Sequence, residues 1–537
     1  MKIRINTVAL ILFGIISVGI FLRTYQFHDW LRFNADQSRD ASLVSHVVDG
    51  NVAWPLLGPK AGGTTFKLGG AFYYLQIVSA KVFGNSPDKM AYPDLFASIL
   101  TIPLLFLLMR RAFQARTALL LTAGLSVSVF AIKYARFAWN PNSAPLYSIL
   151  FLYALLAIAD AKTVKKLRWA LVAGVALGIG VQLHTVLLVV MPITALLFFM
   201  FIGRKTPSLW RPAAIVFAVA FALNIGQVID LAQTNGANVK AFFGATTTKT
   251  ANGKTLLGDL ATDAVCQAQA DAFIISGIGN DDECGTDMVI STYQKAKGLS
   301  GKLPFLVGLF LSVLFSVGGA WLWIRAIRKS TDGQVKLFLQ LTGMYALINF
   351  ILFIPLANEI SLRFYLASMF VPFILLGLWI EALSVFAGTY RKQMLIATLS
   401  ILAIVLCTNS MAVWTAFLDH SGKTLVSGST STEITLGEVE GIAEYITSHF
   451  QSGETVLLKG KQTYIFKYLK SIEYFTAQKG VALKPLSKKK QLTGSEPIVL
   501  IGNAKSKGKL TKSVAETYSA PDFGIYGRFS IEQLIRK

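Results

Sequence analysis

Long apolar runs separated by short charged segments dominate the chain. Eleven runs are long enough to cross a bilayer, near residues 7–22, 92–109, 117–135, 146–159, 169–183, 185–202, 212–229, 304–324, 337–356, 364–384 and 393–412. One further segment, 69–84, fits either a span or an amphipathic helix along the membrane surface, because it holds three glycines and Lys81. The pattern predicts a polytopic α-helical membrane protein.

The distribution of basic residues indicates whether segment 69–84 spans the membrane. If it does not span, sixteen lysines and arginines fall in five short loops on one side of the membrane. The other side receives the loop 230–302, which has eight acidic and six basic residues. Because short cytoplasmic loops are enriched in Lys and Arg, we expect 11 spanning helices, with the N-terminus in the cytoplasm and the C-terminus outside. A spanning 69–84 segment would reverse this pattern.

The first apolar run is expected to stay in the protein as an anchor. It follows the basic start Met1-Lys-Ile-Arg4, and it ends in the bulky residues 21–25 rather than in a cleavage site of small residues. A cleaved signal peptide is the alternative. Charged residues make up 15% of the chain, below the ~25% of soluble domains. We therefore expect a multi-pass protein of the cell (plasma or inner) membrane, with the lipid bilayer as a partner.

The net charge of +22 does not point to a nucleic acid. Its basic residues gather in the short loops between apolar runs, where they act as a topology signal. No nucleic-acid partner is expected.

The composition changes beyond residue 413. Helix and strand patterns alternate there, at 436–450, 454–459, 463–471 and 497–502. The chain is therefore expected to divide into a membrane domain, 1–412, and a small extracytoplasmic α/β domain, 413–537. Lysines at 488–490 and 505–512 offer a surface for an anionic glycan, phospholipid or polymer, and a solvated loop is the alternative. The tail holds no catalytic motif.

Two of the three cysteines, Cys266 and Cys284, lie in the outer loop 230–302. In an oxidising compartment they would form a disulfide that contributes ~3 kcal/mol by restricting the unfolded chain. Two unpaired thiols are the alternative. Cys407 lies in an apolar run and is expected to behave as a small apolar residue.

The first outer loop, 23–91, carries the strongest chemical signal, Asp36-Gln-Ser-Arg39. A carboxylate can accept a proton from an attacking hydroxyl, and a guanidinium can hold a phosphate and neutralise its charge. In the alternative reading, Asp36 caps an interfacial helix over 37–48 and Arg39 meets lipid headgroups.

A Gly- and Pro-rich stretch follows, with Lys60 and Lys67, and it leads into Tyr73 and Tyr74. Lysines can serve as point charges for phosphate, and glycine lets backbone approach a headgroup closely. The alternative is a surface loop anchored at the interface by its tyrosines.

Other polar residues are expected at the same outer level: Arg136 and Asn140 after the third run, His184 between the fifth and sixth, and Arg363 and Tyr365 at the start of the tenth. Arg363 would otherwise snorkel to headgroups, and His184 would otherwise be a polar turn residue.

This order of elements resembles the GT-C class of polyprenyl-phosphate-sugar glycosyltransferases, closest to family 39, the protein O-mannosyltransferases, and to the aminoarabinose transferases that modify lipid A. Those relatives carry Asp-Glu-x-Arg in this loop, and this chain has Asp36-Gln37-Ser38-Arg39. Their aromatic-Glu-Lys-Pro stretch corresponds to residues 65–68, of which Lys67 is kept. Asn140-Pro141 stands where they often have Asp-Pro, and Arg363 and Tyr365 match an Arg-Tyr pair. The resemblance covers about residues 1–410.

The resemblance implies an inverting transfer of a sugar from a polyprenyl-phosphate carrier to a hydroxyl acceptor on a protein, lipid or cell-envelope glycan, outside the cytoplasm. Asp36 would be the catalytic base. Arg39, Lys67 and Arg363 would bind the donor phosphate, and Asn140 would line the pocket, to which we add Lys60, Tyr73, Tyr74, Arg136 and Tyr365. No acid cluster stands beside Asp36, so we expect no metal and no other cofactor.

Two other classes of function compete with this reading. One is a membrane transporter or flippase for a lipid or glycan, and the other is a non-catalytic assembly or ligase-like protein. Ion-coupled carriers place ionisable residues near the bilayer midplane, and the apolar runs here hold almost none.

Overall fold

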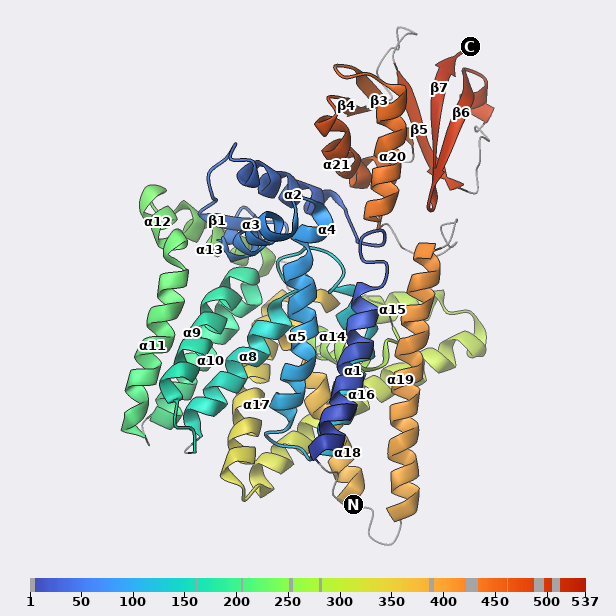
Figure 1. Cartoon of the computed structure of the whole chain (residues 1–537). Coiled ribbons are helices and arrows are strands. Elements are labelled where there is room, and N and C mark those ends of the chain that lie inside the picture. Colours follow the sequence, from blue (N-terminus) through green and yellow to red (C-terminus); the bar gives the residue numbers. More distant parts are fainter. Residues whose placement is uncertain are drawn as a thin grey trace.

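The computed structural model describes residues 5–160, 162–203, 206–250, 255–279, 283–385, 391–421, 433–460, 462–486, 497–504 and 512–537. They form a helical bundle, a cap of short helices and a hairpin at one end of it, and an α/β domain beyond the cap (Figure 1). The side chains of the lysine clusters at 488–490 and 505–512 lie outside the described residues.

All the bundle helices except α14 (Leu256–Ser276) come from the apolar runs. Its helices are α1 (Ile5–Thr24), α5 (Tyr92–Met109), α6 (Ala115–Val127), α7 (Val129–Lys133), α8 (Ala144–Ala159), α9 (Lys166–Leu183), α10 (Thr185–Gly203), α11 (Trp210–Leu223), α12 (Ile225–Gln233), α14 (Leu256–Ser276), α16 (Gly298–Lys329), α17 (Gly333–Phe353), α18 (Val371–Val385) and α19 (Arg391–Ser421). Short 3₁₀ segments join them: η1 (Pro207–Leu209), η2 (Ile354–Leu356) and η3 (Leu362–Ser368).

Seven helices in the described part of the chain are long and apolar enough to cross a membrane. Two bent pairs raise this number to nine if each pair is one span: α11 with α12, bent by 54°, and η3 with α18, bent by 69°. Two shorter apolar helices, α6 and α8, lie in two further predicted runs. Every predicted run therefore falls on a helix or a broken helix, and the number of 11 spans stays a prediction.

The cap contains the first outer loop. It is formed by α2 (Ala35–Val48), the antiparallel strands β1 (Leu57–Lys60) and β2 (Lys67–Gly69), α3 (Ala71–Phe83) and α4 (Pro87–Met90). Segment 69–84 thus provides α3, a helix of 13 residues that lies with α2 over one end of the bundle (Figure 1). The first residues of α1 lie at the opposite end of the bundle (Figure 1).

The loop expected at 230–302 is largely helical, with α13 (Ala237–Thr250), α14 and α15 (Thr286–Lys295). The buried side chains of α14 include Phe273 and Ile274, and the helix packs against α16, α18 and α19. Part of this predicted loop is therefore an inner element of the bundle. The sequence did not predict the packing of α14 within the bundle, because three aspartates interrupt the apolar pattern of this helix.

The C-terminal domain has a five-stranded sheet in the order β4-β3-β5-β7-β6. Its elements are α20 (Leu436–His449), β3 (Thr455–Gly460), α21 (Gln462–Gln478), β4 (Ala482–Pro485), β5 (Ile498–Asn503), α22 (Lys512–Ala515), β6 (Tyr518–Tyr526) and β7 (Phe529–Arg536). Strands β3, β4 and β5 run parallel, and β6 and β7 add an antiparallel edge. The expected boundary at 413 falls inside α19, which continues to Ser421.

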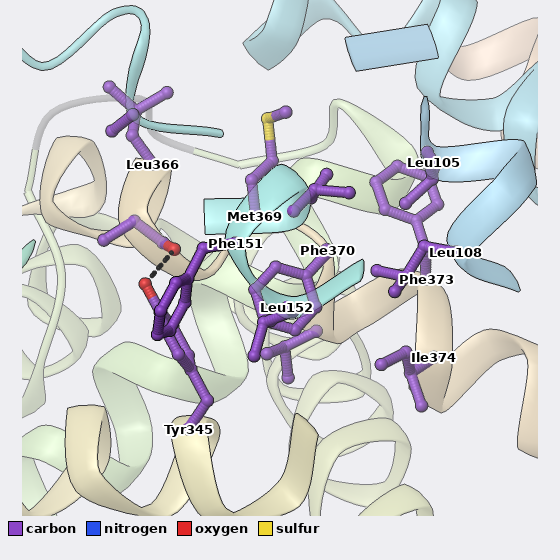
Figure 2. Packing of buried hydrophobic residues seen from close by; sticks show 14 of the residues in the cluster. Leu105, Leu108, Phe151, Leu152, Tyr345, Leu366, Met369, Phe370, Phe373 and Ile374 are labelled. Atoms are coloured by element: carbon purple, nitrogen blue, oxygen red, sulfur yellow. Dashed lines mark hydrogen bonds between the residues drawn. The ribbon is translucent and has the colours of Figure 1, made fainter. Parts of the chain in front are cut away.

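One large apolar core fills the bundle, and a second continues from the cap into the C-terminal domain. In the first, Tyr345 lies among Phe151, Leu152 and Phe370, and its hydroxyl donates to the Ala367 carbonyl oxygen at 3.0 Å (Figure 2). The second core joins Phe33 and Val44 of the cap region to residues of α20 and α21. The cap therefore has packing partners on both sides.

Backbone bonds fix the C-terminal domain to the cap. The backbone N–H of Phe33 donates to the Ile434 carbonyl at 3.0 Å, and the backbone N–H of Leu436 donates to the Leu31 carbonyl at 2.8 Å. Ion pairs flank this contact: Arg32 with Glu433 at 2.9 Å, and the Nε2 atom of His28 with Glu440 at 2.9 Å. Helix α21 packs along α2. The domain thus braces the helix that carries Asp36 and Arg39.

Candidate active site

Helix α2 begins just before the Asp36–Arg39 motif. Asn34 is its N-cap residue, and the backbone N–H of Asn34 donates to the Oε1 atom of Gln37 at 3.1 Å. Asp36 therefore lies within the first turn and is not the cap, so the capping alternative for Asp36 is not what the structure shows. Gln37 also donates from Nε2 to the Ala138 carbonyl at 3.3 Å, a bond that a glutamate carboxylate could not make.

Asp36 and Arg39 form an exposed ion pair. The Nη1 atom of Arg39 lies 2.9 Å from Oδ1 of Asp36, and the two side chains are 54% and 61% exposed. Exposed pairs of this kind contribute only about 0–1 kcal/mol. An incoming anion can therefore replace Asp36 on Arg39 at little cost, which would leave the carboxylate free to accept a proton.

Asp40 lies one turn further along α2 and is only 2% exposed. Arg39 donates to it from Nε at 2.9 Å and from Nη2 at 3.1 Å, and the Tyr73 hydroxyl of α3 donates to its Oδ1 atom at 2.9 Å. Burial raises the pKa of Asp40 to about 6, against the lowering effect of the Arg39 charge and the Tyr73 bond. Burial also raises the pKa of Tyr73, and the neighbouring Asp40 charge adds to this.

Lys60 and Lys67 are paired across the β1–β2 hairpin, and both are exposed. The hairpin is held at two points. The Asn238 side chain bonds both the amide and the carbonyl of Lys67, at 2.8 and 2.9 Å. Gly69 lies against Gln182, so closely that a Cβ atom there would overlap that side chain. Two cations thus stand side by side on a fixed edge.

Tyr74 holds the loop before the hairpin. Its hydroxyl donates to the Pro55 carbonyl at 2.7 Å, and its ring lies 5.6 Å from that of Trp54. Burial raises its pKa. These contacts give Tyr74 a structural role in the cap. Its predicted place in a substrate pocket stays a prediction.

Arg136 is placed differently from the prediction. Its guanidinium is buried and donates to carbonyls at the end of α1, including Arg23 at 3.0 Å and Tyr25 at 2.8 Å. It therefore satisfies carbonyl groups that the helix end leaves without partners. The prediction that Arg136 lines the substrate pocket is corrected accordingly, because long-range contacts with α1 occupy its donors.

Asn140, His184 and Arg363 gather over the upper ends of α8 and α9. Asn140 donates from Nδ2 to the Leu183 carbonyl at 2.6 Å. The guanidinium of the exposed Arg363 lies 5.6 Å from the ring centres of both Trp139 and Phe364. His184 contacts the Phe364 ring at 5.3 Å. The aromatic rings orient Arg363 without neutralising its charge.

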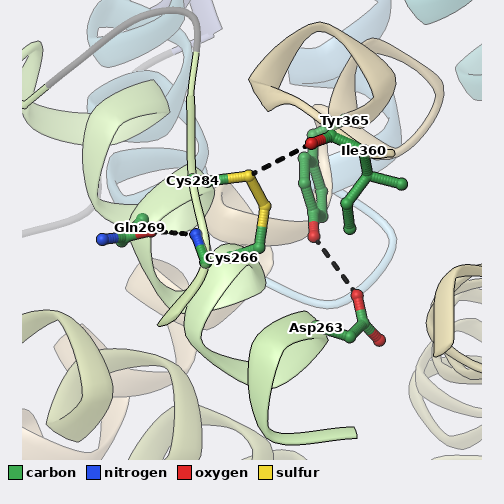
Figure 3. Close-up of a disulfide and its surroundings, with 7 residues drawn as sticks. Asp263, Cys266, Gln269, Cys284, Ile360 and Tyr365 are labelled. Atoms are coloured by element: carbon green, nitrogen blue, oxygen red, sulfur yellow. Dashed lines mark hydrogen bonds between the residues drawn. A yellow bond between two sulfur atoms is a disulfide. The ribbon is translucent and has the colours of Figure 1, made fainter. Parts of the chain in front are cut away.

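Tyr365 points away from this exposed group. It is 1% exposed, and its hydroxyl lies 3.5 Å from Oδ1 of Asp263 in α14 (Figure 3). Cys266, one turn further along α14, forms a disulfide with Cys284. The Sγ atom of Cys284 lies 4.0 Å from the Ile360 carbonyl, just before η3 (Figure 3). The disulfide and Tyr365 thus connect α14 to the segment that bears Arg363.

The structure divides the predicted residues into three groups, and residues that contact two groups connect them. The first is Asp36, Arg39 and Tyr73, the second is the lysine hairpin, and the third surrounds Arg363. Gln37 joins the first group to Ala138, next to the Trp139 ring on which Arg363 lies. Gln182 joins the second to the third, because it touches Gly69 and precedes Leu183, the partner of Asn140.

Sequence reasoning missed three residues that organise these groups: Asp40, Gln182 and Asp263. Asp40 was visible as an acid beside Arg39, but nothing local indicated its burial. Gln182 and Asp263 lie in helices, and their partners Gly69, Ala71 and Tyr365 are distant in the chain. A polar residue inside an apolar run was the available signal for Gln182.

In the part of the chain that the structure describes, no group of three or more His, Cys, Asp or Glu side chains is arranged to hold a metal ion. Both oxygens of Asp40, the acid nearest to the Asp36–Arg39 pair along α2, accept hydrogen bonds from Arg39 or Tyr73.

A cavity of about 930 Å³ lies among the helices of the bundle. Its lining comes from α10, α14, α16, α17, η3 and α18 and is mostly apolar, with a few polar residues such as Asp271, Ser316 and Ser368. Ser368 is the last residue of η3, the segment on which Arg363 and Tyr365 stand. The cavity therefore begins at the inner end of the segment that presents Arg363.

Comparison with known proteins identifies the fold. ArnT from Cupriavidus metallidurans matches in the apo state and in a structure bound to undecaprenyl phosphate, each with a TM-score of 0.54 and 12% identity over 98% of both chains. The chain has the GT-C glycosyltransferase fold. Residues 71–227 also match the family model for dolichyl-phosphate-mannose-protein mannosyltransferases.

The Saccharomyces cerevisiae protein O-mannosyltransferase complex Pmt1–Pmt2, bound to its sugar donor, matches more weakly, with a TM-score of 0.34 and 12% identity over 44% of this chain and 35% of that one. No curated protein matches the chain significantly. Together the fold and the family match support a glycosyltransferase with a lipid-linked sugar donor, and they do not favour a transporter.

Proposed function

We propose that the chain transfers a sugar from a polyprenyl-phosphate carrier to a hydroxyl acceptor at the cap end of the bundle. The observation that carries this proposal is the Asp36–Arg39 pair, an exposed carboxylate and guanidinium in direct contact on a braced helix of a GT-C fold. Such a displacement needs a base at the attacking oxygen and a cation at the departing phosphate, and this pair offers one group of each kind.

In this reaction the acceptor oxygen attacks the anomeric carbon, and the bond from that carbon to the phosphate oxygen breaks. The electron pair leaves with the phosphate, and the configuration at the carbon inverts. Asp36 takes the hydroxyl proton. The reaction needs no nucleotide, and we propose that it needs no divalent cation, because the fixed cations of the site offset the charge of the departing phosphate.

Arg39, Lys67 and Arg363 are proposed to hold the carrier phosphate. Arg39 and Arg363 keep exposed guanidinium groups in fixed positions, one against carboxylates and the other against aromatic rings. Lys67 stands beside Lys60 on the hairpin, so a second cation is available to the same anion. Asn140 and Tyr73 are proposed to shape the pocket around the sugar or the acceptor.

The bundle cavity is proposed to receive the polyprenyl tail. It is mostly apolar, and its volume of about 930 Å³ suits a long hydrocarbon chain. A 3₁₀ segment rises about 2 Å per residue, so the five residues from Arg363 to Ser368 span on the order of 10 Å. A phosphate at Arg363 would then lie within reach of the cavity for a polyprenyl tail.

We infer that the cap end faces away from the cytoplasm. Helix α1 begins at the other end of the bundle (Figure 1), and the short loops of that end carry the basic residues that mark the cytoplasmic side. The donor and the acceptor would then meet at the outer leaflet of the cell membrane.

The variant Asp36→Asn tests the proposal. Purified protein in liposomes receives a radiolabelled polyprenyl-phosphate sugar and an extract of hydroxyl-bearing acceptors. Because the amide cannot take the proton, turnover should fall on the order of 10²-fold or more, whereas the KM for the donor should change little. Asp49→Asn is the matched control, since Asp49 lies at the other end of α2 and its carboxylate accepts an exposed hydrogen bond from Asn85 at 3.1 Å.

Near-normal transfer by Asp36→Asn would remove Asp36 from its role as base. Equal loss in Asp36→Asn and Asp49→Asn would show instead that α2 tolerates no change of charge, and the assignment of the base to Asp36 would fall.

A further inference from the structure

Asp40 is a buried carboxylate that accepts hydrogen bonds from two neighbours, Arg39 and Tyr73. Of its three bonds, two come from Arg39 and one from Tyr73. Burying a carboxylate is costly unless it is paired and hydrogen-bonded, and a pair formed under these conditions has one favoured geometry. The network therefore fixes the plane of the Arg39 guanidinium.

The fixed plane determines which part of Arg39 stays available. The edge formed by Nε and Nη2 faces Asp40, and Nη1 faces Asp36 on the exposed side of α2. Tyr73, from α3, keeps Asp40 from turning away with Arg39. Only the Nη1 side of the guanidinium can then meet an anion from outside.

We propose that Asp40 is a positioning residue for the donor: it holds Arg39 with its Nη1 side open to the carrier phosphate. This inference rests on the proposed function and specifies how that site binds its anion. Asp40 lies outside the Asp-x-x-Arg motif, and its role follows from its contacts with Arg39 and Tyr73 alone.

Stability does not explain the presence of this carboxylate. Burial raises the pKa of Asp40 to about 6, so its charged form is less stable inside the protein than it would be in water. Asn at this position would keep one acceptor oxygen and would carry no buried charge. A structural role therefore predicts loss of stability in Asp40→Asn, and a positioning role predicts loss of anion affinity.

The test measures binding, independently of transfer. The probes are decaprenyl phosphate and the neutral decaprenol, bound to the full-length protein in detergent. Asp40→Asn should weaken the affinity for decaprenyl phosphate about tenfold, as expected for charged hydrogen bonds that lose their geometry, and should leave decaprenol binding unchanged. Its melting temperature at pH 7.5 should be no lower than that of the wild type.

Arg39→Gln provides the second arm. If Asp40 acts through Arg39, then Asp40→Asn should cause no further loss of affinity in the Arg39→Gln background, because residues in one network are not additive. Asp49→Asn is the control of equal charge change on the same helix, and it should bind both lipids like the wild type.

The outcomes separate the two proposals. If the wild type binds decaprenyl phosphate better than decaprenol and Asp40→Asn binds it equally well, the role of Asp40 is overturned and the proposed function stands. Losses that add fully in the double variant, or a lower melting temperature with equal loss for both lipids, also overturn it. A wild type that does not distinguish the two lipids refutes the proposed function, and this inference with it.

Discussion

Asp36 and Asp40 lie one helical turn apart on α2 and have different surroundings. Asp36 is exposed and accepts a hydrogen bond from Nη1 of Arg39, whereas Asp40 is buried and accepts hydrogen bonds from Arg39 and Tyr73. The exposed acid can exchange its partner for a substrate, and the buried one cannot. A single arginine between them therefore links a group suited to proton transfer with a group suited to holding that arginine in place.

The raised pKa of Asp40 has a consequence for stability. Its folded-state pKa of about 6 exceeds the ordinary carboxyl value of about 3.9, so its contribution is greatest below pH ~4 and is lost as the pH rises through 6. The loss amounts to at most ~3 kcal/mol, at 1.36 kcal/mol per pKa unit. The burial-raised pKa of Tyr73 keeps that hydroxyl protonated throughout.

We therefore expect Asp40→Asn to gain stability relative to the wild type between pH 4.5 and pH 7.5. Thermal unfolding in detergent at several pH values measures the difference, and Asp49→Asn is the control. A difference that stays constant with pH would mean that Asp40 has an ordinary pKa in the folded protein.

At the residue scale, the sequence predicted contacts that depend on local spacing. Asp36 and Arg39 stand three residues apart, and a helix brings such residues together. The burial of Asp40 depends on α3, and the contacts of Arg136 depend on α1, more than a hundred residues away. No local sequence pattern indicates such contacts. Arg136, which the sequence placed in the substrate pocket, therefore binds the carbonyl groups at the end of α1 instead.

At the scale of elements, α14 and η3 form a unit. Tyr365 and the disulfide connect them, and η3 carries Arg363 at one end and Ser368 of the cavity lining at the other. The position of Arg363 thus depends on a loop that is distant in the sequence.

Removal of the disulfide tests this dependence. Cys266→Ala with Cys284→Ala frees a loop closed over 18 residues, which should lower the free energy of unfolding by ~3 kcal/mol. The affinity for decaprenyl phosphate should fall as well, because η3 loses a support. Cys407→Ala is the control, since Cys407 is a free, exposed thiol. Unchanged affinity in a destabilised double variant would separate α14 from the phosphate site.

The apolar pattern predicted the position of each bundle helix except α14, because spanning length and hydrophobicity are properties of the local sequence. It did not predict the bends at α11–α12 and η3–α18, since a bend is set by neighbouring helices. It also missed the β6–β7 hairpin, where Pro521 and Gly524 interrupt the strand pattern of the long β6 strand.

At the scale of the whole molecule, the C-terminal domain packs against the cap. Arg528, which is fully buried, joins Glu438 of α20 at 2.8 Å to Asp419 of α19 at 3.3 Å. The sequence predicted the domain and its α/β class, but its contact with α2 required the fold. The domain therefore supports the helix on which Asp36, Arg39 and Asp40 stand.

We propose that the carrier phosphate binds to Arg39, Lys67 and Arg363, which stand on α2, the lysine hairpin and η3. A polyprenyl phosphate with a photoreactive diazirine next to its phosphate, crosslinked to the protein in liposomes, tests this most directly. We expect labelled peptides at 35–48, 57–69 and 362–368, and their labelling should disappear when unlabelled decaprenyl phosphate is added. Labelling confined to the other end of the bundle, at 110–116 or 325–336, would contradict it.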